Sequence, residues 1–397
     1  MEQHKDNLDV AICGAGPVGL ALAALLARRG VDGRRIALID ARALGQAISD
    51  PRSIALAWGS RMLLEEIGAW PLLGANSATP IHTIHVSRRG QFGRSLMDRD
   101  EHGLEALGYV TRYGEVVDAL SRAVERAGIQ VIRPARVAAL DETAEQVTLA
   151  LDDGRRLTAQ VVVGAEGGVF GAQENKAQTR DYGQSAVIAR VSASSPIPHR
   201  AFERFTDEGP LALLPQDGPD GHAYALVWCV RPERAELLQA MEDERFLAEL
   251  DEAFGARLGR FTRVSARFAY PLGLNAEPRA TTRSVAIGNA AQTLHPVAGQ
   301  GLNLGLRDAA VLARLLARCA GPEAIGRFIE ERAQDRQATV ALTDAMARAF
   351  VGSGPLQPVL GLGLAALDAV KPARTLLAEL MMYGRRGGSA LLPHRQG

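Results

Sequence analysis

The sequence predicts an α/β fold in which a doubly wound parallel-sheet domain is interrupted by an antiparallel β-sheet domain and followed by C-terminal helices. A short apolar strand at 8–13, a glycine-rich turn and an Ala/Leu-rich helix open the chain as a βαβ unit does. Between 185 and 230, short alternating segments separated by Pro, Gly and Asp turns are typical of an antiparallel sheet with one open face. A buried-strand segment returns at 284–288 before a long helix, so the first domain is completed after the interruption.

The composition is that of an ordinary globular protein. Of the 397 residues, 47% are hydrophobic and 23% charged, and Lys+Arg equals Asp+Glu at 45 each, so no global field favours nucleic acid. Cys13, Cys229 and Cys319 match no metal-ligand spacing, and their unpatterned placement indicates reduced thiols in the cytoplasm. A polar stretch at 1–7 leads directly into a strand, and no apolar run reaches about 20 residues, so neither a signal peptide nor a membrane span is predicted.

The first half of the chain alternates strand and helix signals. In order, these are a strand at 8–13, a helix to Arg29, a strand at 36–40, a helix at 53–67, a loop at 70–78, a helix at 115–127 and a meander of strands at 137–140, 147–151 and 157–163. Asp152-Asp153-Gly154 predicts the hairpin turn between the last two strands of the meander.

The second half begins with the short segments of the antiparallel sheet. The expected elements are strands at 185–193, 200–206, 211–215 and 223–230, a helix at 234–254, strands at 263–271 and 284–288, a helix at 302–317 and further helices to the C-terminus. Within the last of these, the apolar stretch 359–370 is interrupted by Asp368. It predicts either a core-packing helix or an interfacial helix that docks on a partner or a membrane.

The first glycine motif, Gly14-x-Gly16-x-x-Gly19, stands between a strand and a helix. Gly14 makes the turn, Gly16 lets the backbone approach a pyrophosphate, and Gly19 packs the helix on the strand. The helix N-terminus then offers N–H groups to phosphate, and Asp40, about 20 residues further on, is placed to accept hydrogen bonds from ribose hydroxyls. The motif predicts a Rossmann-like dinucleotide site without separating FAD from NAD; the alternative is a purely structural glycine turn.

A second glycine-rich segment at 286–305 runs from a buried strand through a loop into a long helix. A plain NAD dehydrogenase does not need a second glycine-rich loop and helix N-terminus. A flavoprotein does, because the reduced flavin ring carries negative charge that backbone N–H groups and a helix dipole stabilise. The segment therefore predicts FAD as the cofactor, contacted by Gly299, Gly301, Leu302 and Asn303.

These segments resemble the class A flavoprotein aromatic hydroxylases, especially the ubiquinone-biosynthesis hydroxylases, over nearly the whole chain. The segment 49–56 (SDPRSIAL), which contains Arg52, is similar to the family's arginine-bearing segment beside the flavin. The segment 161–167 stands in the place of its strand–Asp–Gly motif, with Glu166 where Asp is usual. The Gly–Asp pair that holds the FAD ribose in the family has Asn289 here in place of the acid.

Within that family the chain most resembles the 2-octaprenyl-6-methoxyphenol hydroxylase branch. This finer resemblance rests on Asn289 with Gln292, on the run His295-Pro296-Val-Ala-Gly-Gln-Gly, and on the segments 181–186 and 200–215.

The resemblance implies the chemistry. NAD(P)H reduces FAD, O2 adds to give a flavin C4a-hydroperoxide, and the distal oxygen passes to a phenol ring, while the protein orients the cofactor and needs no metal. No second Gly-x-Gly-x-x-Gly follows a strand, so NAD(P)H is expected to dock transiently as a cosubstrate.

Arg52, His295 and Pro296 are the candidate catalytic residues. Arg52 is the positive partner of the flavin or pyrophosphate, His295 either acts at the ring or braces the loop, and Arg112 is either a cofactor contact or a surface residue.

The expected division into domains has six parts. The FAD-binding domain comprises 1–75, 111–170 and 276–320, the substrate domain comprises 76–110 and 171–275, and 321–397 is a C-terminal helical region.

The predicted function is hydroxylation of a prenylated phenol in ubiquinone biosynthesis by a cytoplasmic enzyme in peripheral contact with the inner membrane or with a biosynthetic complex. One alternative is a related flavoprotein hydroxylase that acts on another ring position or on a soluble aromatic. The other is a flavin-binding accessory protein without turnover, because Glu166 and Asn289 soften the usual cofactor contacts.

Overall fold

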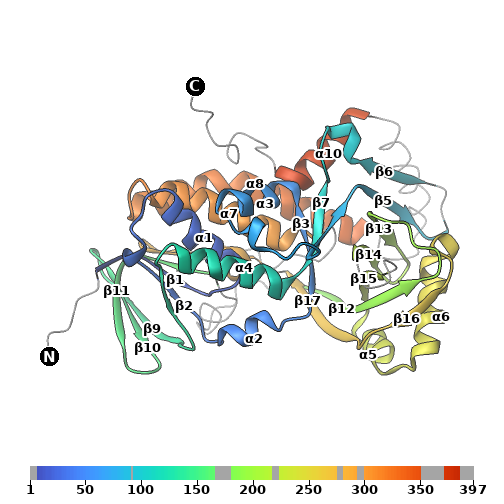
Figure 1. Ribbon diagram of the computed structural model, residues 1–397, viewed down its shortest axis with the longest axis horizontal. Helices are drawn as coiled ribbons and strands as arrows, with labels where there is room; N and C mark the ends of the chain where they lie inside the picture. The colour runs from blue at the N-terminus through green and yellow to red at the C-terminus, as the bar shows by residue number, and fades with distance from the viewer. Residues whose placement is uncertain are drawn as a thin grey trace.

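The computed structural model describes residues 7–90, 93–165, 180–216, 223–274, 280–292, 299–349 and 371–384 of the chain. Within these residues the expected α/β fold is confirmed. A mainly parallel sheet with helices on one face stands beside a second, mainly antiparallel sheet (Figure 1).

The parallel sheet has the order β8-β2-β1-β11, with β18 paired to β11. Its strands are β1 (Asn7–Cys13), β2 (Ile36–Ile39), β8 (Gln130–Ile132), β11 (Arg156–Gly164) and β18 (Ser284–Ala286). The helices α1 (Pro17–Arg28), α4 (Tyr113–Arg126) and α7 (Gln300–Leu316) lie together on one face (Figure 1). Their apolar side chains form one core with Val10, Ile12 and Val163 of the sheet. Each Leu, Val or Ile buried there contributes roughly 1.5–3 kcal/mol.

The opposite face of the parallel sheet is covered by the meander, which the structure confirms. β9 (Val137–Glu142) and β10 (Val147–Leu151) continue antiparallel from β11. Leu149 of β10 packs with Leu8 and Ala37 of the parallel strands in a second core. Gly154 closes the predicted hairpin turn with a φ of 86°, a conformation that favours glycine.

The second sheet has the order β16-β12-β15-β14-β13-β5-β6, with β17 paired to β12. Its strands are β5 (Thr83–Arg88), β6 (Arg94–Asp98), β12 (Arg180–Ala193), β13 (Arg200–Phe205), β14 (Pro210–Gln216), β15 (Ala223–Val230), β16 (Phe261–Val264) and β17 (Phe268–Leu274). The pairing is antiparallel throughout except between β13 and β5, which run parallel. One face is covered by α5 (Pro232–Ala240) and α6 (Asp243–Phe254), whose Leu238 and Phe246 pack with Trp228 of the sheet.

Two elements expected as single pieces are divided in the structure. The helix expected at 234–254 is α5 followed by α6, because Met241 and Glu242 both take extended backbone and Asp243 starts a new first turn, where acidic side chains suit the helix dipole. The strand expected at 263–271 is β16 followed by β17, which pair with different parts of β12.

A third, small sheet has the order β3-β7-β4 and contacts both β14 of the antiparallel sheet and α7 of the first core. Its strands are β3 (Ser53–Ala57), β4 (Ala78–Ile81) and β7 (Gly108–Arg112). The helix expected at 53–67 was therefore wrong for its first five residues, since α3 covers only Trp58–Glu66. The segment is a strand because it pairs with β7, more than 50 residues away in sequence, and such pairing overrides local propensity.

The described C-terminal part consists of α8 (Pro322–Ala349) and α10 (Lys371–Tyr383). Ala378 and Met382 of α10 pack on Val86 and Phe205 of the second sheet. At the same end of the helix, the carbonyl of Met381 accepts a hydrogen bond of 3.2 Å from Nε2 of Gln300, the first residue of α7. α10 therefore touches both the antiparallel sheet and the start of α7. The apolar stretch 359–370 lies outside the described residues.

Candidate functional site

The carboxyl ends of the parallel strands converge on the first glycine turn. The N–H of Gly14 donates to the carbonyl of Ile39 at 2.7 Å, and the N–H of Ile287 donates to that of Gly164 at 2.8 Å. A Cβ at Gly19 would lie 1.8 Å from the oxygen of Gly14, so only glycine lets α1 start this close to the turn. Ligands of open α/β sheets bind at this edge, outside the carboxyl ends of the strands.

The N-terminus of α1 is shaped for an anion. Its N-cap residue is Gly16, which supplies no side-chain cap. A Cβ at Gly16 would lie only 3.1 Å from the hydroxyl oxygen of Tyr113, so a larger side chain would crowd this position. Uncapped N–H groups and the positive end of the helix dipole are the features that bind phosphate.

Asp40 directly follows β2 and is 3% exposed. Its Oδ2 accepts the N–H of Ala15 at 2.7 Å, and its Oδ1 accepts the N–H of Arg42 at 2.7 Å. These bonds fix the carboxylate beside the glycine turn and leave each oxygen a further lone pair for a hydroxyl donor.

The second glycine segment packs directly on the first. Gly288 has a φ of 60°, and a Cβ there would lie 3.2 Å from Cγ2 of Val18 in α1. A Cβ at Gly305 would lie 2.8 Å from the same methyl group and 3.0 Å from Cα of Gly288. The structure therefore brings the two glycine motifs, widely separated in sequence, into contact through α1 and α7.

The N-terminus of α7 presents a second bare helix end. Its N-cap is Gly299, in the left-handed region with a φ of 60° and with no side-chain cap. Gly301 and Leu302 in the first turn are half-buried, and a Cβ at Gly301 would meet nothing within 4 Å. This helix end therefore has room for a ligand against its backbone.

Asn303 has a structural task that its sequence position did not reveal. Its side chain is 2% exposed, and its Oδ1 accepts the N–H of Ala57 and the hydroxyl of Ser60, both at 2.8 Å. Its Nδ2 donates to the carbonyls of Ala55 at 3.0 Å and Gly299 at 2.8 Å. The side chain thus links the first turn of α7 to β3 and α3.

Arg52 stands just before β3 and faces the same edge. Its Nε donates to Oδ1 of Asp50 at 2.9 Å, its Nη2 to Oδ2 at 2.7 Å, and its guanidinium lies 4.9 Å from the ring centroid of Tyr113. The hydrogen bonds with Asp50 raise the pKa of Arg52. Burial of Asp50 opposes its ionisation, but the hydrogen bonds from Arg52 prevail and lower the pKa of the carboxyl. The arginine is therefore a fixed positive charge at this site.

The remaining sequence candidates are placed as follows. Arg112 ends β7 opposite Ser53 and is exposed, and Asn289 is exposed in the short turn after β18. Glu166, His295 and Pro296 lie outside the described residues.

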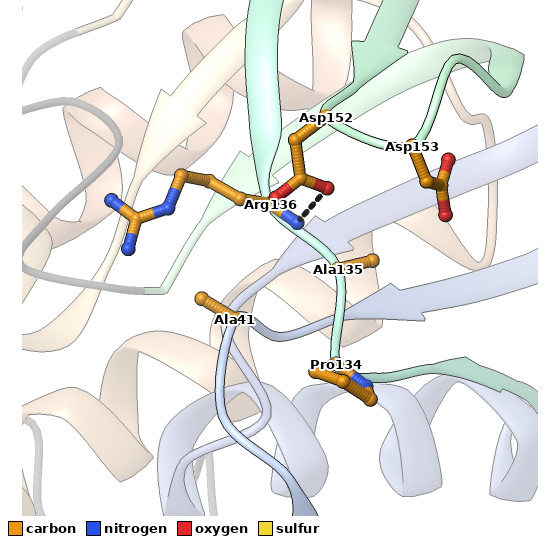
Figure 2. Close-up of a pocket in the computed structure, with 6 residues that line it drawn as sticks. All are labelled: Ala41, Pro134, Ala135, Arg136, Asp152 and Asp153. Atoms are coloured by element: carbon orange, nitrogen blue, oxygen red, sulfur yellow. Dashed lines mark hydrogen bonds between the residues drawn. The ribbon is translucent and has the colours of Figure 1, made fainter.

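A pocket of about 410 Å³ opens beyond Asp40, and Figure 2 shows its lining. It is lined by Ala41, Pro134, Ala135, Arg136, Asp152 and Asp153. The N–H of Ala135 donates to the carbonyl of Asp40 at 2.9 Å, and the N–H of Arg136 donates to the Asp152 carboxylate at 3.0 Å. In the sequence, Asp152 and Asp153 indicate only a hairpin turn. The signal for the pocket was that Ala41 and Pro134 follow two neighbouring parallel strands, β2 and β8.

The face of the second sheet away from α5 and α6 carries a row of side chains in register. Glu203 pairs with Ala212, Ala212 with Val227, Val227 with Ile188, and Ile188 with Phe268. Directly paired residues point to the same side of a sheet, so these five form one line, which we call the sheet-face row. At about 4.8 Å between strands the row spans roughly 19 Å. It begins at Glu203, 8% exposed, passes three half-buried aliphatic side chains and ends at Phe268, 47% exposed.

Alternate residues of the segments 186–191 and 211–214 therefore make the aliphatic surface of this face. Leu211, Leu213 and Val187 point the other way, into the core under α5 and α6.

Within the parts of the chain that the structure describes, no group of three His, Cys, Asp or Glu side chains is arranged to hold a metal ion. None of the helices described has the length and apolarity to cross a bilayer.

Comparison with known proteins places this arrangement in a family. The family described as FAD binding domain matches residues 7–344. Ubiquinone hydroxylase UbiL of Rhodospirillum rubrum is 35% identical over 387 residues, which cover 94% of this chain and 89% of the relative. The 3-demethoxyubiquinol 3-hydroxylase of Escherichia coli is 30% identical over 317 residues, covering 78% of this chain and 79% of the relative.

The fold is also that of solved flavoprotein structures. p-Nitrophenol 4-monooxygenase PnpA of Pseudomonas putida superposes with a TM-score of 0.73, covering 96% of this chain and 99% of that one, at 18% identity. At this level of identity the likeness concerns the fold alone.

Proposed function

The chain belongs to the FAD binding domain family and is an FAD-dependent monooxygenase, and from this premise we propose that it hydroxylates a prenylated phenol in ubiquinone biosynthesis. The proposed reaction is of the 2-octaprenyl-6-methoxyphenol hydroxylase type, with NAD(P)H and O2 as cosubstrates. The names of the two relatives support a ring hydroxylation in that pathway.

The observation that carries the proposal is the meeting of two uncapped helix N-termini. α1 and α7 both start at a glycine without a side-chain cap, and Val18 of α1 contacts Gly305 of α7. Two separate anionic parts of one cofactor fit these two helix ends: the pyrophosphate at Gly16 and the reduced flavin ring at Gly299 to Asn303.

The rest of an extended FAD fits the remaining features. We assign Asp40 to the adenosine ribose and the pocket beyond Ala41 to the adenine, because the adenine of FAD lies on the far side of that ribose from the pyrophosphate. We assign Arg52, whose guanidinium lies 4.9 Å from the centroid of the Tyr113 ring, as the positive group beside the flavin ring. Bound FAD, once reduced by NAD(P)H, supplies the activated oxygen, and the protein binds, orients and shields the reacting groups. Arg112, Glu166, Asn289, His295 and Pro296 stay in the proposed site as further contacts.

The sheet-face row supports a substrate with a long apolar tail. Ala212, Val227 and Ile188 offer a half-buried aliphatic surface and no charged anchor. Removing apolar tail area from water contributes about 25 cal/mol per Å2, so a tail along roughly 19 Å of such surface contributes several kcal/mol.

The outer end of the row supports peripheral contact with a membrane, which would supply a prenylated lipid. Phe268 is 47% exposed and Tyr270, on the same strand, is 41% exposed. Exposed aromatic side chains on one strand offer an apolar contact surface of the kind that marks interaction sites.

The test is hydroxylation of 2-prenylphenols of increasing tail length by the FAD-reconstituted protein in detergent or liposomes. We expect NAD(P)H oxidation to become increasingly coupled to ring hydroxylation, with less peroxide, as the tail grows. Ile188→Gln should weaken binding of long-tailed phenols by about tenfold and that of short phenols little, because a polar amide then lies under the tail. Ile329→Gln, on an Ile of α8 that is 37% exposed, is the matched control and should change neither.

Two outcomes contradict the proposal. A carboxylated, tail-less phenol as the better substrate would remove the ubiquinone-pathway assignment while the monooxygenase assignment stands. Stoichiometric FAD with no hydroxylated product from any prenylphenol would favour a different ring substrate.

A further inference from the structure

Glu203 in β13 is a carboxyl group in an apolar wall. Its side chain is 8% exposed, it forms no ion pair among the described residues, and its Oε1 has no hydrogen-bond partner there. Burial raises the pKa of Glu203 from 4.5 to about 8. An unpartnered buried polar group is costly, and an apolar residue of similar size would stabilise the fold better. The fold gives this acid no structural reason to be there.

The side chains paired directly with Glu203 on the adjacent strands are apolar. Its neighbours on adjacent strands are Val86 and Ala212. Val86 belongs to the cluster that α10 covers with Ala378 and Met382. One polar neighbour is the Cys229 thiol, buried in β15, whose pKa is raised by burial and by the Glu203 charge.

Two contacts link the elements around Glu203 to the proposed flavin site. Phe205 of β13 shares an apolar cluster with Ala378 and Met382 of α10, which contacts the start of α7 through Met381 and Gln300. On the other side β13 continues into β14, whose Gln216 donates from Nε2 to the Ser53 hydroxyl at 2.8 Å, one residue from Arg52. The acid is thus the buried inner end of the sheet-face row, and Phe268 is its exposed outer end.

We propose that Glu203 is a catalytic residue that receives the hydroxyl group of the phenol substrate and accepts its proton. The inference rests on the proposed function and adds the group that recognises the head of the substrate, with the tail lying outward along the sheet-face row.

The proton transfer is balanced between the phenol hydroxyl and the Glu203 carboxylate. The phenol O–H bond breaks, an O–H bond forms on the Glu203 carboxylate, and the electron pair left on the phenol oxygen enriches the ring carbons ortho and para to it. No electron passes to or from the protein. A carboxyl group whose pKa lies near neutrality suits this exchange, because its ionised form is available and the proton is returned readily.

Three other ionisable groups face Glu203 or its immediate neighbours from the elements packed on it. They are Cys229 of β15, Arg88 of β5, which pairs with Asp207 at 3.2 Å, and Tyr383 of α10. The residues of β14 on this face, Ala212 and Leu214, do not ionise. Arg88 is already neutralised by its partner, and burial raises the pKa of both Cys229 and Tyr383, so Glu203 is the group of this set that titrates near pH 8.

The first measurement is binding, without turnover. The holoenzyme is titrated with 2-geranylphenol and with its methyl ether, which lacks the O–H donor, and the perturbed absorbance of bound FAD reports both dissociation constants. We expect the phenol to bind about tenfold more tightly than the ether in the wild type, and equally in Glu203→Leu. Glu252→Leu, on an exposed glutamate of α6 behind the opposite face of the sheet, should keep the wild-type preference.

The second measurement separates hydroxyl binding from proton acceptance. Glu203→Gln keeps the size of the side chain and can hydrogen-bond a hydroxyl, but it cannot take the proton. We expect it to retain FAD, to bind 2-geranylphenol within a few-fold of the wild type, and to hydroxylate it about 100-fold more slowly in a single turnover. The wild-type rate should rise with pH to a plateau above about 8, and the Gln variant should lack that rise.

The outcomes are distinguishable. If the wild type binds 2-geranylphenol but Glu203→Leu keeps the same preference for it over the ether, Glu203 does not receive the hydroxyl and the inference is overturned while the proposed function stands. An unchanged pH profile in a folded, FAD-loaded Glu203→Gln variant overturns the proton role. If the wild type binds neither probe, the proposed substrate class fails and the inference fails with it.

Discussion

Replacing Asn303 by alanine should destabilise the protein by about 3–4 kcal/mol. The side chain makes hydrogen bonds with Ala57 N–H, the Ser60 hydroxyl, and the carbonyls of Ala55 and Gly299, at 2.8 to 3.0 Å. Each such bond contributes about 1 kcal/mol net, and truncation also leaves buried backbone groups without a partner. Set against a total stability of roughly 5–15 kcal/mol, the loss is large.

The assay is urea denaturation of the protein with and without saturating FAD, together with the FAD dissociation constant. Asn289→Ala is the matched control, because Asn289 is exposed in the turn after β18. It should change the stability of the FAD-free protein by less than about 0.5 kcal/mol. We expect Asn303→Ala to lose stability in both states, because the first turn of α7 is released from β3.

One result would refute this reasoning. If Asn303→Ala weakened FAD binding but left the FAD-free protein as stable as the control, the side chain would be a cofactor ligand and not the tie between α7 and β3.

Three further predictions follow from the same geometry. Gly19→Ala should abolish FAD binding or folding, measured by flavin absorbance and circular dichroism, because the new Cβ would lie 1.8 Å from the oxygen of Gly14; retained affinity would show that the turn adapts. Arg52→Ala should raise the FAD dissociation constant by roughly 10- to 100-fold, as loss of one charge-assisted hydrogen bond does, and more than Arg112→Ala; equal effects would mean that Arg52 is not beside the ring. Folding raises the pKa of Glu203 to about 8, so this group makes the protein less stable as pH rises from about 4.5 to 8, by roughly 3–5 kcal/mol, with no further change above. Glu203→Gln should remove that slope in urea titrations across this range, and parallel slopes for both proteins would contradict the assignment.

The local sequence was sufficient for the parts of the fold that depend on neighbours along the chain. The first glycine motif, the strand before it and the helix after it occur where the pattern predicted, because the turn, the apolar run and the helix start are all set within about 20 residues. The meander with its Asp152-Asp153-Gly154 turn is similarly local. The FAD prediction followed from two such motifs together and agrees with the family.

The tertiary structure decided what depends on distant partners. Segment 53–57 is a strand only because β7 supplies its hydrogen bonds. The Asn303 side chain links α7 to β3 only because β3 lies beside the first turn of α7. Glu203 appeared in the sequence as one charged residue within a strand, and nothing local distinguished it. It became a candidate catalytic group when the pairing of β13 with β14 and β5, and the packing of α10, removed its carboxyl from water and left Oε1 without a hydrogen-bond partner among the described residues. Burial and hydrogen-bond satisfaction are properties of the assembled chain, since they depend on which distant segments meet, and no single stretch of sequence contains them.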